Sequence, residues 1–197
     1  MPDGFVPRLT KDGIYGAKYW YSRTNPFYPA YQMPNCTCYA WGRFWEESGD
    51  EHVPHLPTGN AGTWFGKAQA AGYETGSEPA LGAVACFGKK GAAGHVAIVE
   101  QIATNGDINC SNSGYYRPVS TTNWHYFFMT TNKKSNNYVP WSGYYFQGFI
   151  YNPYAGGGTP IDPDNPYPDT PGNPNRLKRF YNVVTNQKNW FKKYYLK

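Results

Sequence analysis

Residues 156–175 limit how much of this chain can fold into one core. The run contains six Pro and four Gly and almost no apolar side chains. Such a composition forms a semi-rigid, extended linker, because it has little to bury. We therefore expect a domain over 1–154, a linker over 155–175 and a basic aromatic tail over 176–197. The tail is too short for a core of its own and is expected to begin a further domain or to dock elsewhere.

The apolar side chains of the 197-residue chain are mostly aromatic. The sequence has 19 Tyr, 11 Phe and 7 Trp, while charged residues make up 16% and the net charge is +5. A modest charge combined with this much aromatic surface argues against disorder and predicts an aromatic-rich, partly polar core. No run of about 20 apolar residues is present, so we expect no membrane span. The first residues do not resemble a signal peptide.

The positive charge is concentrated in the tail. Residues 1–155 carry 11 Lys and Arg against 10 Asp and Glu, whereas residues 176–197 carry seven Lys and Arg and no acid. A nucleic-acid-binding domain places its basic residues on a folded face. We therefore expect no nucleic-acid partner for the domain.

The order of the predicted elements indicates an α+β fold, with N-terminal helices packed on an antiparallel sheet. Asn35 is a suitable N-cap for the first helix, and a Thr-Asn-Gly-Asp run at 104–107 is typical of a hairpin turn. Apolar spacing predicts helices over 36–47 and 62–71 and strands over 82–87, 95–102, 108–112 and 144–151.

The sequence offers Cys36 as a candidate nucleophile. It lies in the first turn of the predicted helix, where free N–H groups and the helix dipole lower a thiol pKa. Cys86 and Cys110 fall in apolar strands and are expected to be buried free thiols. The spacing between Cys36 and Cys38 is too short for a zinc knuckle, and no calcium loop is present, so we expect no metal and no cofactor.

A nucleophilic Cys needs a His that holds its proton. His95 opens the predicted strand 95–102 directly after the glycine-rich run 91–94, whereas His52, His55 and His125 lie in polar stretches. On position alone, His95 suits a structural role as well as a catalytic one. Aromatic runs such as 141–146 suit either the core or the wall of a substrate site.

Five blocks of the sequence, in order and at similar separations, resemble the CHAP family of cysteine, histidine-dependent amidohydrolases/peptidases. They are NCTCYAWGR at 35–43, GTW at 62–64, AAGY at 70–73, PALGAVA at 79–85 and GHVAIVE at 94–100. The resemblance covers roughly residues 30–152. It implies a papain-like α+β fold and hydrolysis of amide bonds in bacterial peptidoglycan.

The resemblance assigns roles to individual residues. Cys36 matches the nucleophile and His95 the general base, while Asn112 stands where the family commonly has Glu. Cys38 replaces a usual Trp, and two helical positions differ by about 200°, so both thiols cannot point into one site. The N–H of Cys36 would contribute to an oxyanion hole.

Two side chains near the nucleophile are candidates for completing that oxyanion hole, Asn35 and Tyr31.

Hairpin geometry determines how far Asn112 lies from His95. A strict two-residue turn at 105–106 would pair Asn112 with Val99, about 13 Å along the strand from His95. A hydrogen bond between Asn112 and His95 therefore requires a shifted register or a bulge that places them diagonally opposite each other.

These inferences predict a peptidoglycan hydrolase of Gram-positive walls, either an endopeptidase or an N-acetylmuramoyl-L-alanine amidase. We expect a monomer whose partner is peptidoglycan. Without a signal peptide, a bacteriophage lysin or tail-associated protein is favoured, released from the host cytoplasm at lysis or carried on the virion. The alternatives are a cysteine acyltransferase or transglutaminase-like enzyme and a non-catalytic wall-binding module.

Overall fold

A computed structural model of the chain describes residues 5–114 and 126–155. The predicted linker from residue 156 onward, the tail and His125 lie outside this part. In chain order, the described elements are α1 (Lys18–Tyr21), α2 (Cys36–Ser48), η1 (Ala61–Thr63), α3 (Trp64–Ala70), β1 (Thr75–Gly76), β2 (Val84–Lys89), β3 (His95–Ile102), β4 (Ile108–Asn112), β5 (Phe128–Asn132), η2 (Lys134–Asn136) and β6 (Tyr144–Ile150).

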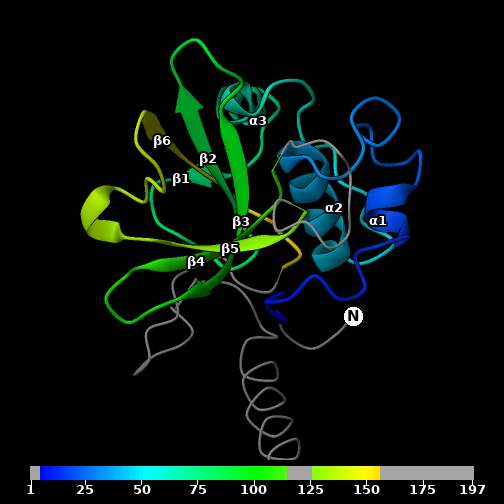
Figure 1. Cartoon of the computed structure of the whole chain (residues 1–197), viewed down its shortest axis with the longest axis horizontal. Coiled ribbons are helices and arrows are strands. Elements are labelled where there is room, and N and C mark those ends of the chain that lie inside the picture. Colours follow the sequence, from blue (N-terminus) through cyan, green and yellow to red (C-terminus); the bar gives the residue numbers. More distant parts are fainter. Residues whose placement is uncertain (1–4, 115–125, 156–197) are drawn as a thin grey trace, which may run out of the picture.

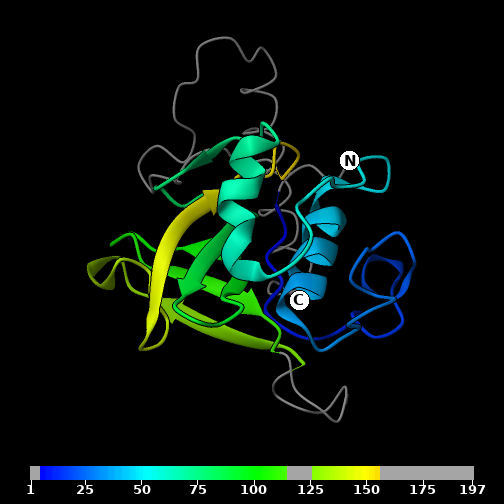
Figure 2. The same ribbon diagram turned by 90° about the horizontal axis from the view of Figure 1, so that it is seen from above.

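The strands form one six-stranded sheet in the order β1-β6-β2-β3-β4-β5, and every pair is antiparallel. Figure 1 shows α2 beside the sheet with α1 on its outer side. Figure 2, seen from above, shows α3 between β6 and α2. Helices packed on an antiparallel sheet confirm the predicted α+β class.

Local signals in the sequence explain where α2 begins. The Oδ1 atom of Asn35 accepts hydrogen bonds from the N–H groups of Thr37 and Cys38 at 2.9 and 3.0 Å. This arrangement satisfies two of the amides that a helix start leaves free, so the predicted N-cap is confirmed. The helix ends at Ser48, one residue later than expected.

The core is aromatic, as the composition predicts. Its largest fully buried side chains include Trp20, Trp64, Tyr39, Tyr126, Phe44, Phe87 and Phe149. One cluster fills the space between the helices and the sheet, and a second covers the other face of the sheet. Alternation along β3 divides its side chains between the two clusters, with Val96 and Ile98 in the first and Ala97 and Val99 in the second.

The turn between β3 and β4 holds three residues, 104–106, rather than two. The N–H of Ala103 bonds to the carbonyl of Asp107 at 2.8 Å, and Gly106 closes the loop with a φ of 82°. A three-residue hairpin loop with a left-handed Gly is a common alternative to the two-residue turn. This loop moves the register by one residue from the strict hairpin.

A bulge at Glu100 moves the register by a second residue. Ile102 pairs with Ile108 and Gln101 with Asn109, but Val99 pairs with Cys110. Because side chains alternate along a strand, a shift of one residue would turn Asn112 to the opposite face, and a shift of two returns it to the face of His95.

Glu100 of the bulge is held by a buried ion pair with α2. Its carboxylate accepts two hydrogen bonds from Arg43, at 2.9 Å each, one from the Ser111 hydroxyl at 2.7 Å and one from the Arg8 amide at 2.7 Å. Arg43 is 4% exposed and Glu100 is 1% exposed. The pair therefore ties the bulged residue of β3 to α2, to β4 and to the N-terminal segment.

Arg43 also meets the carboxylate of Glu47, with Nη2 and Oε1 2.9 Å apart. Within the described part of the chain, neither oxygen of Glu47 accepts a hydrogen bond. Burial raises the pKa of Glu47 well above its usual value, against the opposing effect of Arg43. Arg43 is thus surrounded by three acidic side chains, those of Glu46, Glu47 and Glu100.

We predict that Arg43→Met lowers the free energy of unfolding by about 3–5 kcal/mol, because it leaves the Glu100 carboxylate buried without its partner. The control is Lys18→Met, which breaks the exposed pair of Lys18 with Asp50. That change should cost at most about 1 kcal/mol. Urea denaturation measures both, and equal losses would contradict a structural role for the buried pair.

Candidate active site

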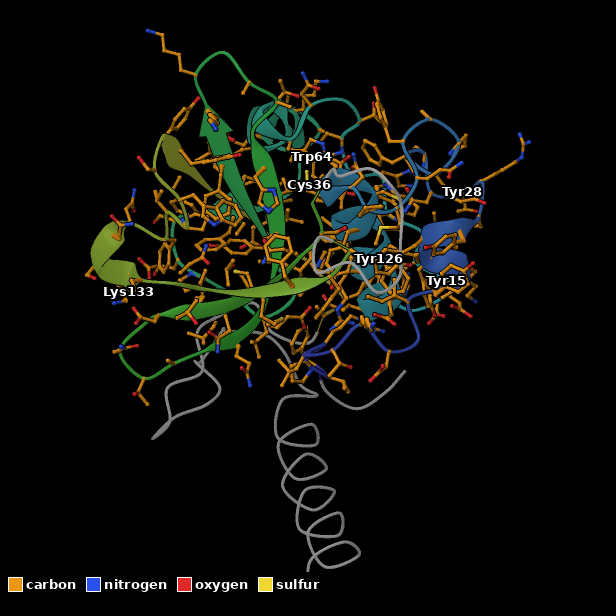
Figure 3. The ribbon with its side chains drawn as sticks, viewed as in Figure 1. Tyr15, Tyr28, Cys36, Trp64, Tyr126 and Lys133 are labelled. Atoms are coloured by element: carbon orange, nitrogen blue, oxygen red, sulfur yellow. The ribbon has the colours of Figure 1, made fainter. Side chains whose placement is uncertain are left out.

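Cys36 is the first residue of α2 and is partly exposed. Figure 3 shows it at the upper end of α2, on the side toward β3. The backbone N–H groups of Val96, Thr37 and Cys36 itself are near enough to its thiol to act against the rise of its pKa. The first of these belongs to the peptide bond that joins His95 to Val96. The candidate nucleophile therefore lies against the start of β3.

The resting thiol is less acidic than the helix start led us to expect. Burial raises the pKa of Cys36, although the three backbone N–H groups oppose the rise. The expectation of a lowered pKa was wrong because it considered the helix end alone and not the packing around the sulfur. At neutral pH the Cys36 thiol of the free protein is therefore protonated.

Cys38 belongs to the core and not to the site. It has no exposed surface, and its Sγ lies 3.8 Å from the carbonyl oxygen of Trp20. Burial raises the pKa of Cys38 to about 12. Cys86 and Cys110 are likewise buried and free. Of the four thiols, Cys36 alone has exposed surface.

The side chains of His95 and Asn112 meet as the shifted register predicts. Continuing the β3–β4 register by one pair places Asn112 opposite Ala97, diagonally across from His95. The Nε2 atom of His95 lies 2.9 Å from the Oδ1 atom of Asn112. Both residues are buried.

The partners of Asn112 determine which nitrogen of His95 carries the hydrogen. Its Nδ2 group donates to the Cys110 carbonyl at 2.8 Å and to the Thr130 hydroxyl at 3.0 Å. The oxygen of Asn112 therefore faces His95 and can only accept, so Nε2 donates. In the neutral imidazole, Nδ1 is then free to accept a proton.

Burial keeps that imidazole neutral. It lowers the pKa of His95 to about 4, while the hydrogen bond to Asn112 acts in the opposite direction. The ring stacks near Phe87, with centroids 6.4 Å apart, and meets Trp141 edge-on at 5.1 Å. Aromatic surroundings disfavour the charged form of a histidine.

Gly94 fixes the start of β3. Its φ is 77°, and a Cβ there would lie 2.5 Å from the backbone nitrogen of Gly62. The Gly62 N–H also bonds to the Ala93 carbonyl at 2.7 Å. This close backbone contact, possible only for glycine, places His95 next to the segment that precedes α3.

No hydrogen bond joins Cys36 to His95 within the described part of the chain. Contacts between a nucleophile and its base are often long in free proteins and shorten when substrate binds. The structure brings the thiol to the peptide bond after His95 and positions the imidazole through Asn112.

The two oxyanion candidates occupy different surroundings. Asn35 is 8% exposed, and its oxygen caps α2 beside Cys36. Tyr31 is 53% exposed. Asn35 is therefore fixed next to the candidate nucleophile, whereas the side chain of Tyr31 lies at the surface.

Thr130 is a supporting residue that the sequence analysis missed. It lies in β5, which no alternating pattern marked in advance, and it holds the amide of Asn112.

The described residues contain no cluster of three or more His, Cys, Asp or Glu side chains able to hold a metal ion. Among the described helices, none has the length and apolar content needed to cross a membrane.

Taken together, the fold and site define an α+β protein with a thiol at a helix start and a His–Asn pair on the neighbouring sheet. Residues 26–114 match the sequence model of the CHAP domain family. The Cys36, His95 and Asn112 positions all fall within the matched residues.

Curated proteins and solved structures show partial similarity. A provisionally named hydrolase of Streptococcus mutans is 39% identical over 57 residues, which are 29% of this chain and 26% of that protein. The staphylococcal secretory antigen SsaA of Staphylococcus epidermidis is 35% identical over 85 residues, 43% of this chain and 30% of that protein. The chain thus spans less than a third of each of these relatives.

An N-acetylmuramoyl-L-alanine amidase from Staphylococcus aureus has a crystal structure with a TM-score of 0.42 and 24% identity. The match covers 59% of this chain and 32% of that one.

We predict that Asn112→Asp raises the pKa of His95 from about 4 by roughly 1–3 pH units, because a carboxylate beside Nε2 stabilises the imidazolium. The raised pKa means that the ring gains its proton at a higher pH. The control is Asn105→Asp, which adds the same charge at the exposed β3–β4 turn. NMR titration of His95 measures both variants, and an unchanged pKa in Asn112→Asp would contradict the contact.

Proposed function

We propose that the chain is a peptidoglycan hydrolase that cleaves an amide bond with Cys36 as nucleophile, His95 as base and Asn112 as the residue that orients the imidazole. The observation that carries the proposal is the hydrogen bond from His95 Nε2 to Asn112 Oδ1. It leaves Nδ1 free for a proton, among residues that match the CHAP family model, and the partly exposed Cys36 lies against the peptide bond after His95.

Acylation is proposed to begin from the protonated Cys36 thiol and the neutral His95 imidazole. As Sγ of Cys36 attacks the carbonyl carbon of the substrate amide, Nδ1 of His95 takes the thiol proton. The carbonyl oxygen becomes negative, and the N–H of Cys36, with Asn35 or Tyr31, is proposed to stabilise it. Asn112 accepts a hydrogen bond from the imidazolium and holds the ring in place.

Collapse of this intermediate breaks the carbon–nitrogen bond. The imidazolium returns the proton to the leaving amine, and a thioester remains on Cys36. Water then attacks the thioester while His95 takes one of its protons, and the thiolate recovers that proton as the acid product leaves. The net reaction consumes one water and gives an amine and a carboxylic acid.

The environment of the pair explains why proton transfer accompanies attack. Burial raises the pKa of Cys36 and lowers the pKa of His95 to about 4. A resting thiolate–imidazolium pair is therefore disfavoured in the free protein. This differs from sites in which a carboxylate stabilises the imidazolium, since Asn112 brings no charge.

The proposed substrate is peptidoglycan of a Gram-positive wall, where the protein would act. The match of residues 26–114 to the CHAP family model and the partial similarity to a staphylococcal secretory antigen support this location. Retention of both the thiol and the imidazole argues against a module that only binds the wall.

Mass spectrometry of digested walls would distinguish an amidase from an endopeptidase. The bacteriophage origin stays a prediction.

We predict that Cys36→Ala lowers wall hydrolysis by about 10³-fold or more, because the nucleophile is removed. The matched control is Cys38→Ala, which makes the same change two residues away in the core and should retain most activity. Clearing of a turbid wall suspension measures both, with thermal melting to confirm folding. An active Cys36→Ala protein would exclude the mechanism.

We predict that His95→Ala is as damaging as Cys36→Ala, and that the double variant is no worse than either one. The nucleophile and its base act as one unit, so their losses do not add. The same turbidity assay, extended to high protein concentration, measures all three variants. Additive losses would show that the two groups do not share a proton.

A further inference from the structure

Two aromatic side chains, Trp141 and Tyr144, form successive ring contacts that begin at the imidazole of His95. Trp141 meets that ring edge-on at 5.1 Å, and Tyr144 meets Trp141 at 5.6 Å. Trp141 is 36% exposed, and Tyr144 is partly exposed. These two rings, which we call the aromatic wall, therefore have surface available to a bound molecule next to the base.

Lys89 lies next to Tyr144, at the end of the aromatic wall away from His95. Lys89 pairs with Tyr144 across β2 and β6, and its ammonium lies 4.7 Å from the centroid of the Tyr144 ring. A cation over an aromatic face is held by the negative face of the ring. The exposed Lys89 side chain thus has a preferred position above the wall.

Lys89 has no acidic partner among the described residues, whereas two other exposed lysines do. Lys18 pairs with Asp50, and Lys134 lies 3.8 Å from Glu78. Within the described ranges, no carboxylate comes within ion-pair distance of Lys89. A positioned cation with no counterion is suited to bind an anion from another molecule.

The wall lies close to the reacting groups at its other end. The pKa of Tyr144 is raised first by burial and second by the charge of a Cys36 thiolate, so the phenol lies within the field of the sulfur. The ring contacts of 5.1, 5.6 and 4.7 Å place the ammonium within about five extended residues of the imidazole, at roughly 3.3 Å per residue. A short peptide could reach from one to the other.

We propose that Lys89 is a specificity residue that binds a free carboxylate of the peptidoglycan stem peptide, while Trp141 and Tyr144 support the stretch between that carboxylate and the amide at Cys36. The proposal rests on the proposed function and deepens it. Stem peptides carry acidic side groups that some walls leave as carboxylates and others convert to carboxamides. Lys89 selects the acidic form.

The test uses a soluble stem-peptide fragment in two forms, with either a free carboxylate or a carboxamide on its glutamyl residue. Lys89→Ala should raise KM for the acidic fragment about fivefold, which corresponds to an exposed ion pair of about 1 kcal/mol. The kcat, and the KM for the carboxamide, should stay within twofold of wild type. Lys89→Arg should restore the preference.

The matched control is Lys90→Ala, which removes the neighbouring exposed lysine in the turn after β2. It should leave the KM for both fragments unchanged. The proposal is overturned if Lys89→Ala raises the KM for both fragments equally, or if Lys90→Ala has the same effect. Loss of activity on intact walls alone, with unchanged KM for the fragments, would instead assign Lys89 to anionic wall polymers and also overturn it.

Binding separates this proposal from the proposed function. In a Cys36→Ala background, calorimetry should give about fivefold weaker binding of the acidic fragment after Lys89→Ala, and no change for the carboxamide. If wild-type protein fails to hydrolyse either fragment but this difference in binding is found, the proposed hydrolysis fails and the Lys89 site stands. If the fragments are hydrolysed but Lys89→Ala changes neither binding nor KM, the Lys89 site is excluded and the proposed hydrolysis stands.

Discussion

The register between β3 and β4 is the constraint on which the site depends. The three-residue turn and the bulge each move Asn112 by one residue, and only their sum returns it to the face of His95 at hydrogen-bonding distance. The bulge is secured on the other side of the strand, where Arg43 of α2 binds Glu100. A charged cluster beneath the helix thus maintains the position of a neutral pair that it does not touch.

The aromatic composition shapes both the core and the site. Tryptophan and tyrosine fill space as well as aliphatic residues do, but they bring polar atoms that require partners. Trp20 donates its ring N–H to the carbonyl of Tyr39 at 2.9 Å, and the Tyr21 and Tyr126 hydroxyls bond to each other. The same residue types form the rings around His95. They help to bury the ring, and burial keeps the imidazole uncharged.

Much of this arrangement could be predicted from the sequence. Strong local signals located α2, β3 and β4 within one residue, because the Asn35 cap and the apolar runs act over short distances. The helix predicted over 62–71 begins instead as the 3-10 turn η1 and becomes α-helical only at Trp64. β1, β5 and α1 were missed, since each is short and β5 has mostly half-buried residues.

In the candidate site too, local sequence signals were predictable, whereas features that depend on distant segments were not. Cys36, His95 and Asn112 were selected from motif and position, and the need for a register shift followed from strand geometry. The bulge at Glu100 could not be located, because it depends on Arg43, 57 positions away in the sequence. The direction of the Cys36 pKa shift was wrong for a similar reason: burial of a sulfur is decided by packing between distant segments.

The protonated state of the resting Cys36 has a consequence for the chemical durability of the protein. Peroxides and disulfides react with thiolates far faster than with thiols. A sulfur whose pKa is raised by burial, beside a histidine that remains neutral down to about pH 4, offers little thiolate to an oxidant. With the other three thiols enclosed in the core, we expect the free protein to resist oxidation by peroxides and disulfides.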